Sequence, residues 1–134
     1  MSPDRIRLRR LMDAQFDAWN RGDLDAAIAT CADNVEYSDP NIDLVGADAL
    51  REHLGAVFSR YRLNLVADDM FALDAADGTD GLMVCWTGTF APLADGPTAE
   101  VRGIDLILFE GDLMVRNDVR FDRLPLIAVR RQPE

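Results

Sequence analysis

The chain has 134 residues, of which 49% are hydrophobic and 28% are charged, and this composition is typical of one folded domain with its own core. Its net charge of −10 argues against nucleic acid or an anionic membrane as a partner, and the sequence contains neither a membrane-spanning apolar run nor a signal-like start. We therefore expect a single domain over residues 1–134, located in the cytoplasm, with neither a nucleic acid nor a membrane as partner.

The residue types that are absent exclude several kinds of catalytic mechanism and metal site. All 14 basic residues are arginines, which excludes a P-loop, a Schiff-base enzyme and a lysine general base. His53 is the one histidine, so a two-histidine metal motif is impossible. Cys31 and Cys85 have no paired spacing and are typical of two reduced core thiols. We expect no metal and no cofactor, so that in an enzyme carboxylates, tyrosines and arginines would do most of the chemistry.

Apolar spacing in the first half of the chain predicts three helices. The first covers residues 4–20, the second is a short helix over residues 24–31, and the third covers residues 47–60. Gln15 lies on the apolar face of the first helix, beside Trp19, where it either reaches water at the helix edge or points into a pocket. His53 lies at the edge of the apolar stripe of the third helix, where packing and catalysis are both open roles.

Between the second and third helices, residues 35–39 form a short strand that Pro40 ends. Tyr37 and Asp39 share one face of this strand. An aspartate before a proline is common turn chemistry, so Asp39 is either a turn residue or a functional carboxylate. The segment after Pro40, as far as Gly46, is expected to be a loop.

The rest of the chain has the alternation of strands. The expected strands are residues 63–73 with a bulge at residues 68–69, residues 82–90, residues 101–109 and residues 113–121. Trp86 is on an apolar face, and the last strand should turn Leu113, Val115, Asn117, Val119 and Phe121 inward. Asn117 is then either a satisfied core residue or a group aimed into a pocket. No further helix is expected, and the tail from Arg123 is interpreted as a strand extension or an ordered cover.

Asp105 lies at the centre of the most apolar strand. Residues 101–109 offer it apolar neighbours on both faces of the strand, so it has no solvated face. A buried carboxylate costs several kcal/mol, so Asp105 should be paired, face a polar cavity, or keep its proton through a raised pKa.

The order of these elements predicts an α+β domain in which a curved antiparallel sheet is wrapped around the N-terminal helices. Six runs of residues also carry a resemblance: Phe16–Asp25, Cys31–Val35, Asp39–Pro40, Gly46–Leu50, Gly103–Asp105 and Val119–Asp122. They resemble the nuclear transport factor 2-like superfamily, and within it most of all the SnoaL-like polyketide cyclases and the ketosteroid isomerases. The resemblance covers residues 4–122 and implies a cystatin-like cone with an internal pocket.

The resemblance also implies roles for the carboxylates. Asp39 falls where the isomerases keep their general base, and Asp105 falls where they keep a protonated oxyanion donor and where the cyclases keep an acid/base aspartate. Gln15 falls at or near the isomerases' oxyanion tyrosine, and it is a far weaker acid. The related limonene epoxide hydrolases use an arginine where this chain has Gly103, which makes epoxide hydrolysis the weaker alternative.

These observations lead to one expected function and two alternatives. We expect cofactor-independent, carboxylate-mediated proton transfer on a small hydrophobic ketone or polyketide, by isomerisation or cyclisation. The alternatives are a binding pocket without turnover and a dimerisation module. A homodimer through the sheet face turned away from the helices is also expected. The expected catalytic residues are Asp39 and Asp105, and the expected substrate-binding residues are Gln15, Trp19, Tyr37, His53, Trp86, Asn117 and Phe121.

Overall fold

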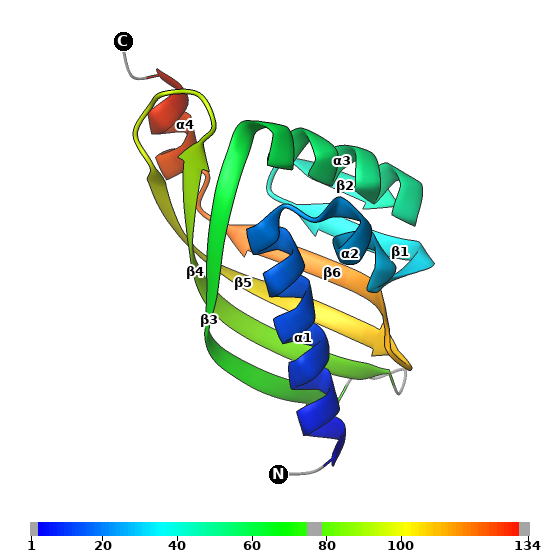
Figure 1. The fold of residues 1–134 in the computed structure, drawn as a ribbon. Helices are drawn as coiled ribbons and strands as arrows, with labels where there is room; N and C mark the ends of the chain where they lie inside the picture. The colour runs from blue at the N-terminus through cyan, green and yellow to red at the C-terminus, as the bar shows by residue number, and fades with distance from the viewer. Residues whose placement is uncertain (1–2, 75–78, 132–134) are drawn as a thin grey trace.

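The computed structural model describes residues 3–74 and 79–131 (Figure 1). It confirms the predicted α+β fold, with a six-stranded curved sheet that does not close. The helices are α1 (Pro3–Arg21), α2 (Leu24–Ala29), α3 (Ala47–Arg60) and α4 (Leu124–Arg131). The strands are β1 (Cys31–Asp39), β2 (Ile42–Val45), β3 (Tyr61–Asp74), β4 (Asp80–Pro92), β5 (Ala99–Glu110) and β6 (Leu113–Phe121).

Local signals set the ends of the first two helices. Gly22, in the left-handed region with a φ of 63°, ends α1 because its N–H turns back to the Trp19 carbonyl. Asp23 then caps α2, where its Oδ1 accepts a hydrogen bond of 3.0 Å from the N–H of Ala26. This compact turn places α1 across the concave face of the sheet, as Figure 1 shows.

The strand order across the sheet is β2-β1-β6-β5-β4-β3. All neighbouring strands are antiparallel except β1 and β6, which run parallel. The long connection between these two parallel strands contains β2, α3, β3, β4 and β5. The sheet is therefore antiparallel with one parallel pair, which the sequence pattern did not indicate. The predicted bulge in β3 is confirmed by the register shift between Ala67 and Asp69.

Three local predictions were wrong. The expected loop before Gly46 contains the strand β2, which pairs with β1. The tail forms the helix α4, although no further helix was expected and a strand extension was one alternative. The other alternative, an ordered cover, holds, since α4 lies against β5. In β6 the inward residue is Met114 and not Leu113, which is 43% exposed, because the register between β5 and β6 shifts after Leu108 and reverses the faces at that end of the strand.

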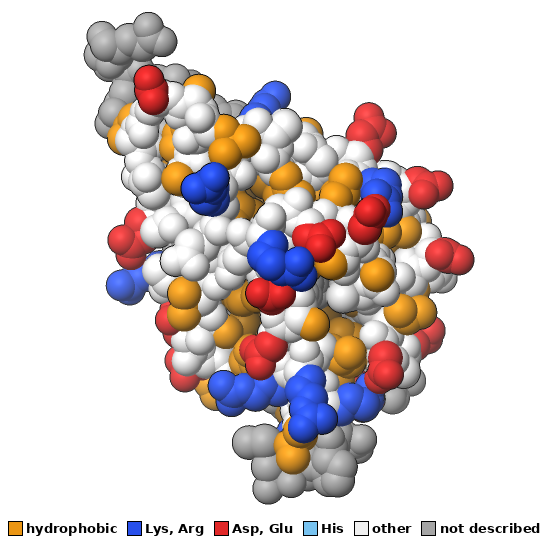
Figure 2. All heavy atoms as spheres, viewed as in Figure 1, with side chains coloured by type: hydrophobic (Ala, Val, Ile, Leu, Met, Phe, Trp, Pro, Cys, Tyr) orange, Lys and Arg blue, Asp and Glu red, His pale blue; other side chains and the backbone are white. Residues whose placement is uncertain are grey.

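The two faces of the sheet differ in burial. The concave face holds the core, to which α1 contributes Leu8, Met12 and Phe16. The convex face carries apolar side chains that no described helix covers, among them Val66, Phe71 and Ile104, which are 44–52% exposed. Figure 2 shows acidic and basic side chains interspersed over the helix-bearing face, so the negative charge does not gather there in one patch. Among the described residues, no helix is long and apolar enough to span a membrane.

Candidate functional site

A cavity of about 380 Å³ lies between α1, α3, the concave face of the sheet and α4. Aromatic side chains form much of its wall, and two carboxylates, Asp39 and Asp105, reach it from different strands. All of the predicted site residues except Asn117 line this cavity: Gln15, Trp19, Tyr37, Asp39, His53, Trp86, Asp105 and Phe121.

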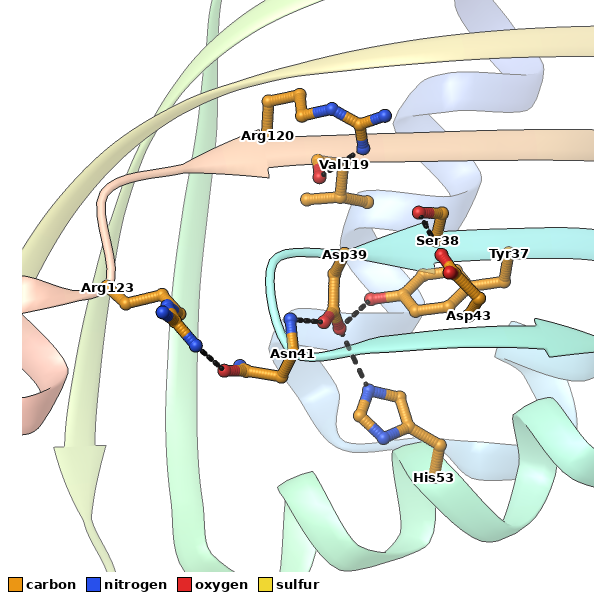
Figure 3. A network of polar contacts seen from close by, with 9 residues as sticks. All are labelled: Tyr37, Ser38, Asp39, Asn41, Asp43, His53, Val119, Arg120 and Arg123. Atoms are coloured by element: carbon orange, nitrogen blue, oxygen red, sulfur yellow. Dashed lines mark hydrogen bonds and ion pairs between the residues drawn. The ribbon is translucent and has the colours of Figure 1, made fainter.

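Asp39, at the end of β1, receives hydrogen bonds from three directions (Figure 3). Its Oδ2 accepts from the Tyr37 hydroxyl at 2.8 Å and lies 3.1 Å from Nε2 of His53. Its Oδ1 accepts from the backbone N–H of Asn41 at 2.8 Å, in the turn that follows Pro40. Asp39 is thus a turn residue whose carboxylate also lines the cavity, and its role as a functional carboxylate stays a prediction.

These contacts keep Asp39 ionised. Burial by itself raises the pKa of this carboxyl, but the hydrogen bonds from His53, Asn41 and Tyr37 outweigh burial, and the net pKa is lowered. Burial also raises the pKa of Tyr37 well above its usual value, with the neighbouring Asp39 adding to the shift. The Tyr37 phenol therefore keeps its proton and acts as a donor to Asp39.

Asp105 has the opposite environment. It is 6% exposed in the middle of β5, and its hydrogen-bond partner among the described side chains is the indole of Trp86, whose Nε1 donates to Oδ1 at 2.8 Å. Burial raises the pKa of Asp105 to about 7, although the Trp86 N–H lowers it in part. The two carboxylates of the cavity therefore differ in protonation near neutral pH, with Asp39 ionised and Asp105 divided between both forms.

Two glycines make room for the Trp86 ring. A Cβ on Gly103 would lie 2.6 Å from Cε2 of the indole and 2.8 Å from the backbone oxygen of Arg120. A Cβ on Gly88 would lie 2.7 Å from a methyl carbon of Leu65 and 3.0 Å from the indole. Real Cβ atoms do not approach an indole and a backbone oxygen as closely as one at Gly103 would, so the position of the Trp86 ring requires glycine there. The crowding at Gly88 comes mainly from the flexible end of the Leu65 side chain.

Gln15 and Asn117 are the other two buried polar side chains. Gln15 lines the cavity, and no described residue forms a hydrogen bond with its side chain, so its amide is available to a ligand. Asn117 is 1% exposed, pairs in register with Tyr37, and does not line the cavity. Neither polar atom of its side chain has a partner among the described residues, so the reading of a satisfied core asparagine is not supported.

The cavity wall also contains residues that the sequence pattern did not predict as site residues. Helix α3 presents His53, Ala56, Val57 and Arg60 to the cavity, which is the spacing of one helical face. Extending the stripe from His53 would have identified Arg60. No sequence signal could have identified Leu126, because it reaches the cavity from a helix that the periodicity did not predict.

The described residues contain no group of three His, Cys, Asp or Glu side chains that could hold a metal ion. The ionisable and polar side chains of the cavity include two carboxyls in different protonation states, one histidine, the guanidinium of Arg60, and neutral donors from Gln15 and Tyr37.

Comparison with known proteins identifies the family of this chain. The model of the SnoaL-like domain family matches residues 12–117. This chain belongs to the SnoaL-like domain family. The match includes both aspartates and the histidine of the cavity. No curated protein matches the chain in sequence.

Solved structures similar to this SnoaL-like chain agree in fold. A candidate polyketide cyclase from Xanthomonas campestris has a TM-score of 0.72 at 23% identity, with 93% of this chain and 97% of that chain covered. A candidate isomerase from Bacillus subtilis has a TM-score of 0.81 at 10% identity, covering 96% and 95%. An epoxide hydrolase of M. tuberculosis has a TM-score of 0.71 at 14% identity, covering 89% and 85%. At these identities the likeness is one of fold, and different activities share it.

Proposed function

We propose that this SnoaL-like protein is a cofactor-independent enzyme that moves a proton at the carbon next to the carbonyl of a small hydrophobic ketone or polyketide. The result would be isomerisation or cyclisation. The observation that carries the proposal is the buried Asp105 carboxyl, which lines an apolar cavity with a pKa of about 7. A general acid or base works best when its pKa is close to the working pH.

The environment of Asp39 supports a different role from the one that the resemblance implied. A carboxylate that already accepts three hydrogen bonds and has a lowered pKa is a weak base. We therefore assign proton transfer to Asp105. The Asp39 carboxylate would hold His53 and Tyr37 in place beside the substrate.

The proposed step balances as follows. The ionised form of Asp105 takes the proton from the carbon next to the carbonyl, and the electron pair of that C–H bond moves to the carbonyl oxygen to form an enolate. The side-chain amide of Gln15 donates a hydrogen bond to the enolate oxygen. Asp105 then returns the proton to another carbon, which completes an isomerisation. In a cyclisation, the enolate carbon instead attacks a second carbonyl and Asp105 protonates the new alkoxide.

The test is exchange of solvent deuterium into ketones that the protein binds, followed by mass spectrometry. A panel of terpenoid ketones, steroids and polyketide fragments covers the proposed class. Asp105→Asn should abolish exchange, while Asp39→Asn should reduce it and weaken binding. The reverse ranking would return the role of base to Asp39 and leave Asp105 as the oxyanion donor. A wild-type protein that binds ketones without exchange would favour the ligand-binding alternative.

We also propose a homodimer in the cytoplasm, with the partner copy covering the convex face of the sheet. Apolar residues that no described helix covers lie side by side on this face, where Phe71 of β3 pairs with Met83 of β4 and Met83 pairs with Leu106 of β5. A contiguous apolar surface of this kind commonly marks an interface. Arg102, Arg116 and Arg120 are exposed and do not line the cavity. They would lie at or near this interface.

A further inference from the structure

The cavity face of α3 changes in chemistry from one end to the other. His53, at one end, contacts Asp39, and Ala56 and Val57 follow as an apolar stretch. Arg60, in the last turn, is the fourth residue of this face to line the cavity. Along this wall, the polar His53 is therefore followed by the apolar Ala56 and Val57 and then by the cationic Arg60.

Arg60 is the one arginine among the residues that line the cavity. Arg60 is exposed and also lines the cavity, which places it where the cavity opens to solvent. None of the ion pairs among the described side chains includes Arg60. Its position in the last turn also suits the helix dipole, but that does not require it to face the cavity. A guanidinium in this position can pair with a carboxylate through two parallel hydrogen bonds.

The Asp39 end of the cavity disfavours a permanently charged anionic group of a ligand. Asp39 is ionised there, and a second negative charge beside it in a poorly hydrated site would be repelled. A ligand that is neutral at its reacting end can carry a negative charge only at the mouth. Since the whole protein carries a charge of −10, an anionic ligand also needs a local cation to be attracted at all.

We propose that the substrate is a hydrophobic keto acid, whose carbonyl lies at the Asp39 and Asp105 end and whose carboxylate is bound by Arg60. This inference rests on the proposed function, because it takes the reacting group to be a carbonyl. Arg60 follows His53 by seven positions, a rise of about 10 Å along the helix, which sets the approximate separation of the two groups in the ligand.

The test uses ligands that differ only in charge or length. The first is 4-(4-oxocyclohexyl)benzoate, in which two rings separate the carbonyl from the carboxylate, and the second is its neutral carboxamide. The third is 4-oxocyclohexanecarboxylate, which is too short to reach both ends. Binding is followed by quenching of tryptophan fluorescence, because both tryptophans of the chain, Trp19 and Trp86, line the cavity.

Wild-type protein should bind the long acid with a Kd about fivefold lower than that of the carboxamide, the gain expected for one exposed ion pair. Arg60→Gln should abolish this preference, because it weakens binding of the long acid more than binding of the carboxamide. Arg62→Gln is the matched control: Arg62 has the same charge two residues later, is exposed and does not line this cavity, so its loss should preserve the preference. The short acid should show no gain over the carboxamide.

Equal affinity of wild-type protein for the long acid and its carboxamide would overturn the proposal. So would loss of the preference in Arg62→Gln, which would indicate an effect of overall charge, or failure of all three ligands to bind at millimolar concentration. Because binding is measured without turnover, these outcomes are distinct from a failure of deuterium exchange, which bears on the proposed function alone.

Discussion

The indole Nε1 of Trp86 donates a hydrogen bond of 2.8 Å to Oδ1 of Asp105 from the neighbouring strand. In the β4–β5 ladder the residue opposite Trp86 is Gly103, and Asp105 lies two positions further along β5. Because Gly103 has no side chain, the ring can lie across its backbone and reach the diagonal carboxyl. The orientation of the Asp105 carboxyl, to which we assign proton transfer, therefore depends on the hydrogen bond from Trp86 and on the absence of a side chain at Gly103.

Trp86→Phe should raise the pKa of Asp105 above its value of about 7, because it removes a hydrogen bond that favours the ionised form. A bond to a charged group contributes about 1.5 kcal/mol or more, so we expect a rise of about one unit. The measurement is a carboxyl ¹³C NMR titration, with Asp105→Asn used to assign the resonance. Trp19→Phe, at the other tryptophan of the cavity wall, should leave the titration unchanged. An unshifted midpoint in Trp86→Phe would contradict this account.

Gly103→Ala should destabilise the protein by about 1–3 kcal/mol, the usual cost of forcing an extra carbon into a packed site. The added methyl would overlap the Trp86 ring and approach the rigid backbone oxygen of Arg120. Gly55→Ala is the control, since a Cβ there meets only Leu24 Cδ2, at an ordinary 3.7 Å, within the helix α3. That change should stabilise by about 0.5–1 kcal/mol through helix propensity. Urea denaturation of both variants measures the difference, and equal effects would be inconsistent with a crowded Trp86 site.

The raised pKa of Asp105 makes this group oppose folding at neutral and higher pH. Between its usual pKa of 3.8 and its folded value of about 7, the folded state binds more protons than the unfolded state. The contribution of Asp105 to the free energy of unfolding therefore falls as pH rises through this window, by up to about 4 kcal/mol. Asp105→Asn removes the ionisation and can still accept the Trp86 hydrogen bond.

Chemical denaturation of wild type and Asp105→Asn at pH 5 and pH 8 tests this sign. The variant should be at least as stable as wild type at pH 8 and should lose less stability between the two pH values. Comparing the two proteins cancels the contribution of other groups, including Asp39, whose lowered pKa acts in the opposite direction. Strong destabilisation of the variant at pH 8 would mean that Asp105 is ionised and paired in the folded protein.

The proposed dimer predicts a mass of twice 14.9 kDa in sedimentation at micromolar concentration. Ile104→Asp should shift the protein toward the monomer, because Ile104 is 44% exposed near the centre of the uncovered sheet face and a buried unpaired charge is costly. Leu93→Asp is the control, since Leu93 is 55% exposed in the loop after β4 and not on that face. A monomeric wild type would rule out the dimer.

The sequence by itself determined the elements whose period repeats over many residues. Three of the four helices and the long strands follow from alternation and from the three and four spacing, since burial on one face imposes those periods. The burial of Asp105 also followed, because its neighbours on both faces are apolar. The face of Met114 did not follow, since an extra residue in β6 between Met114 and Arg116 shifts the register against β5 and reverses the pattern there.

Only the tertiary structure decided which side chains meet. Asp39 and His53 are 14 residues apart on a strand and a helix, and their contact depends on how α3 packs beside β1. The bond from Trp86 to Asp105 depends on strand register, and the position of Arg60 at the cavity mouth depends on how α3 is rotated about its axis. Local periodicity specifies the buried face of an element, whereas the partner across the cavity is fixed by packing between elements distant in the chain.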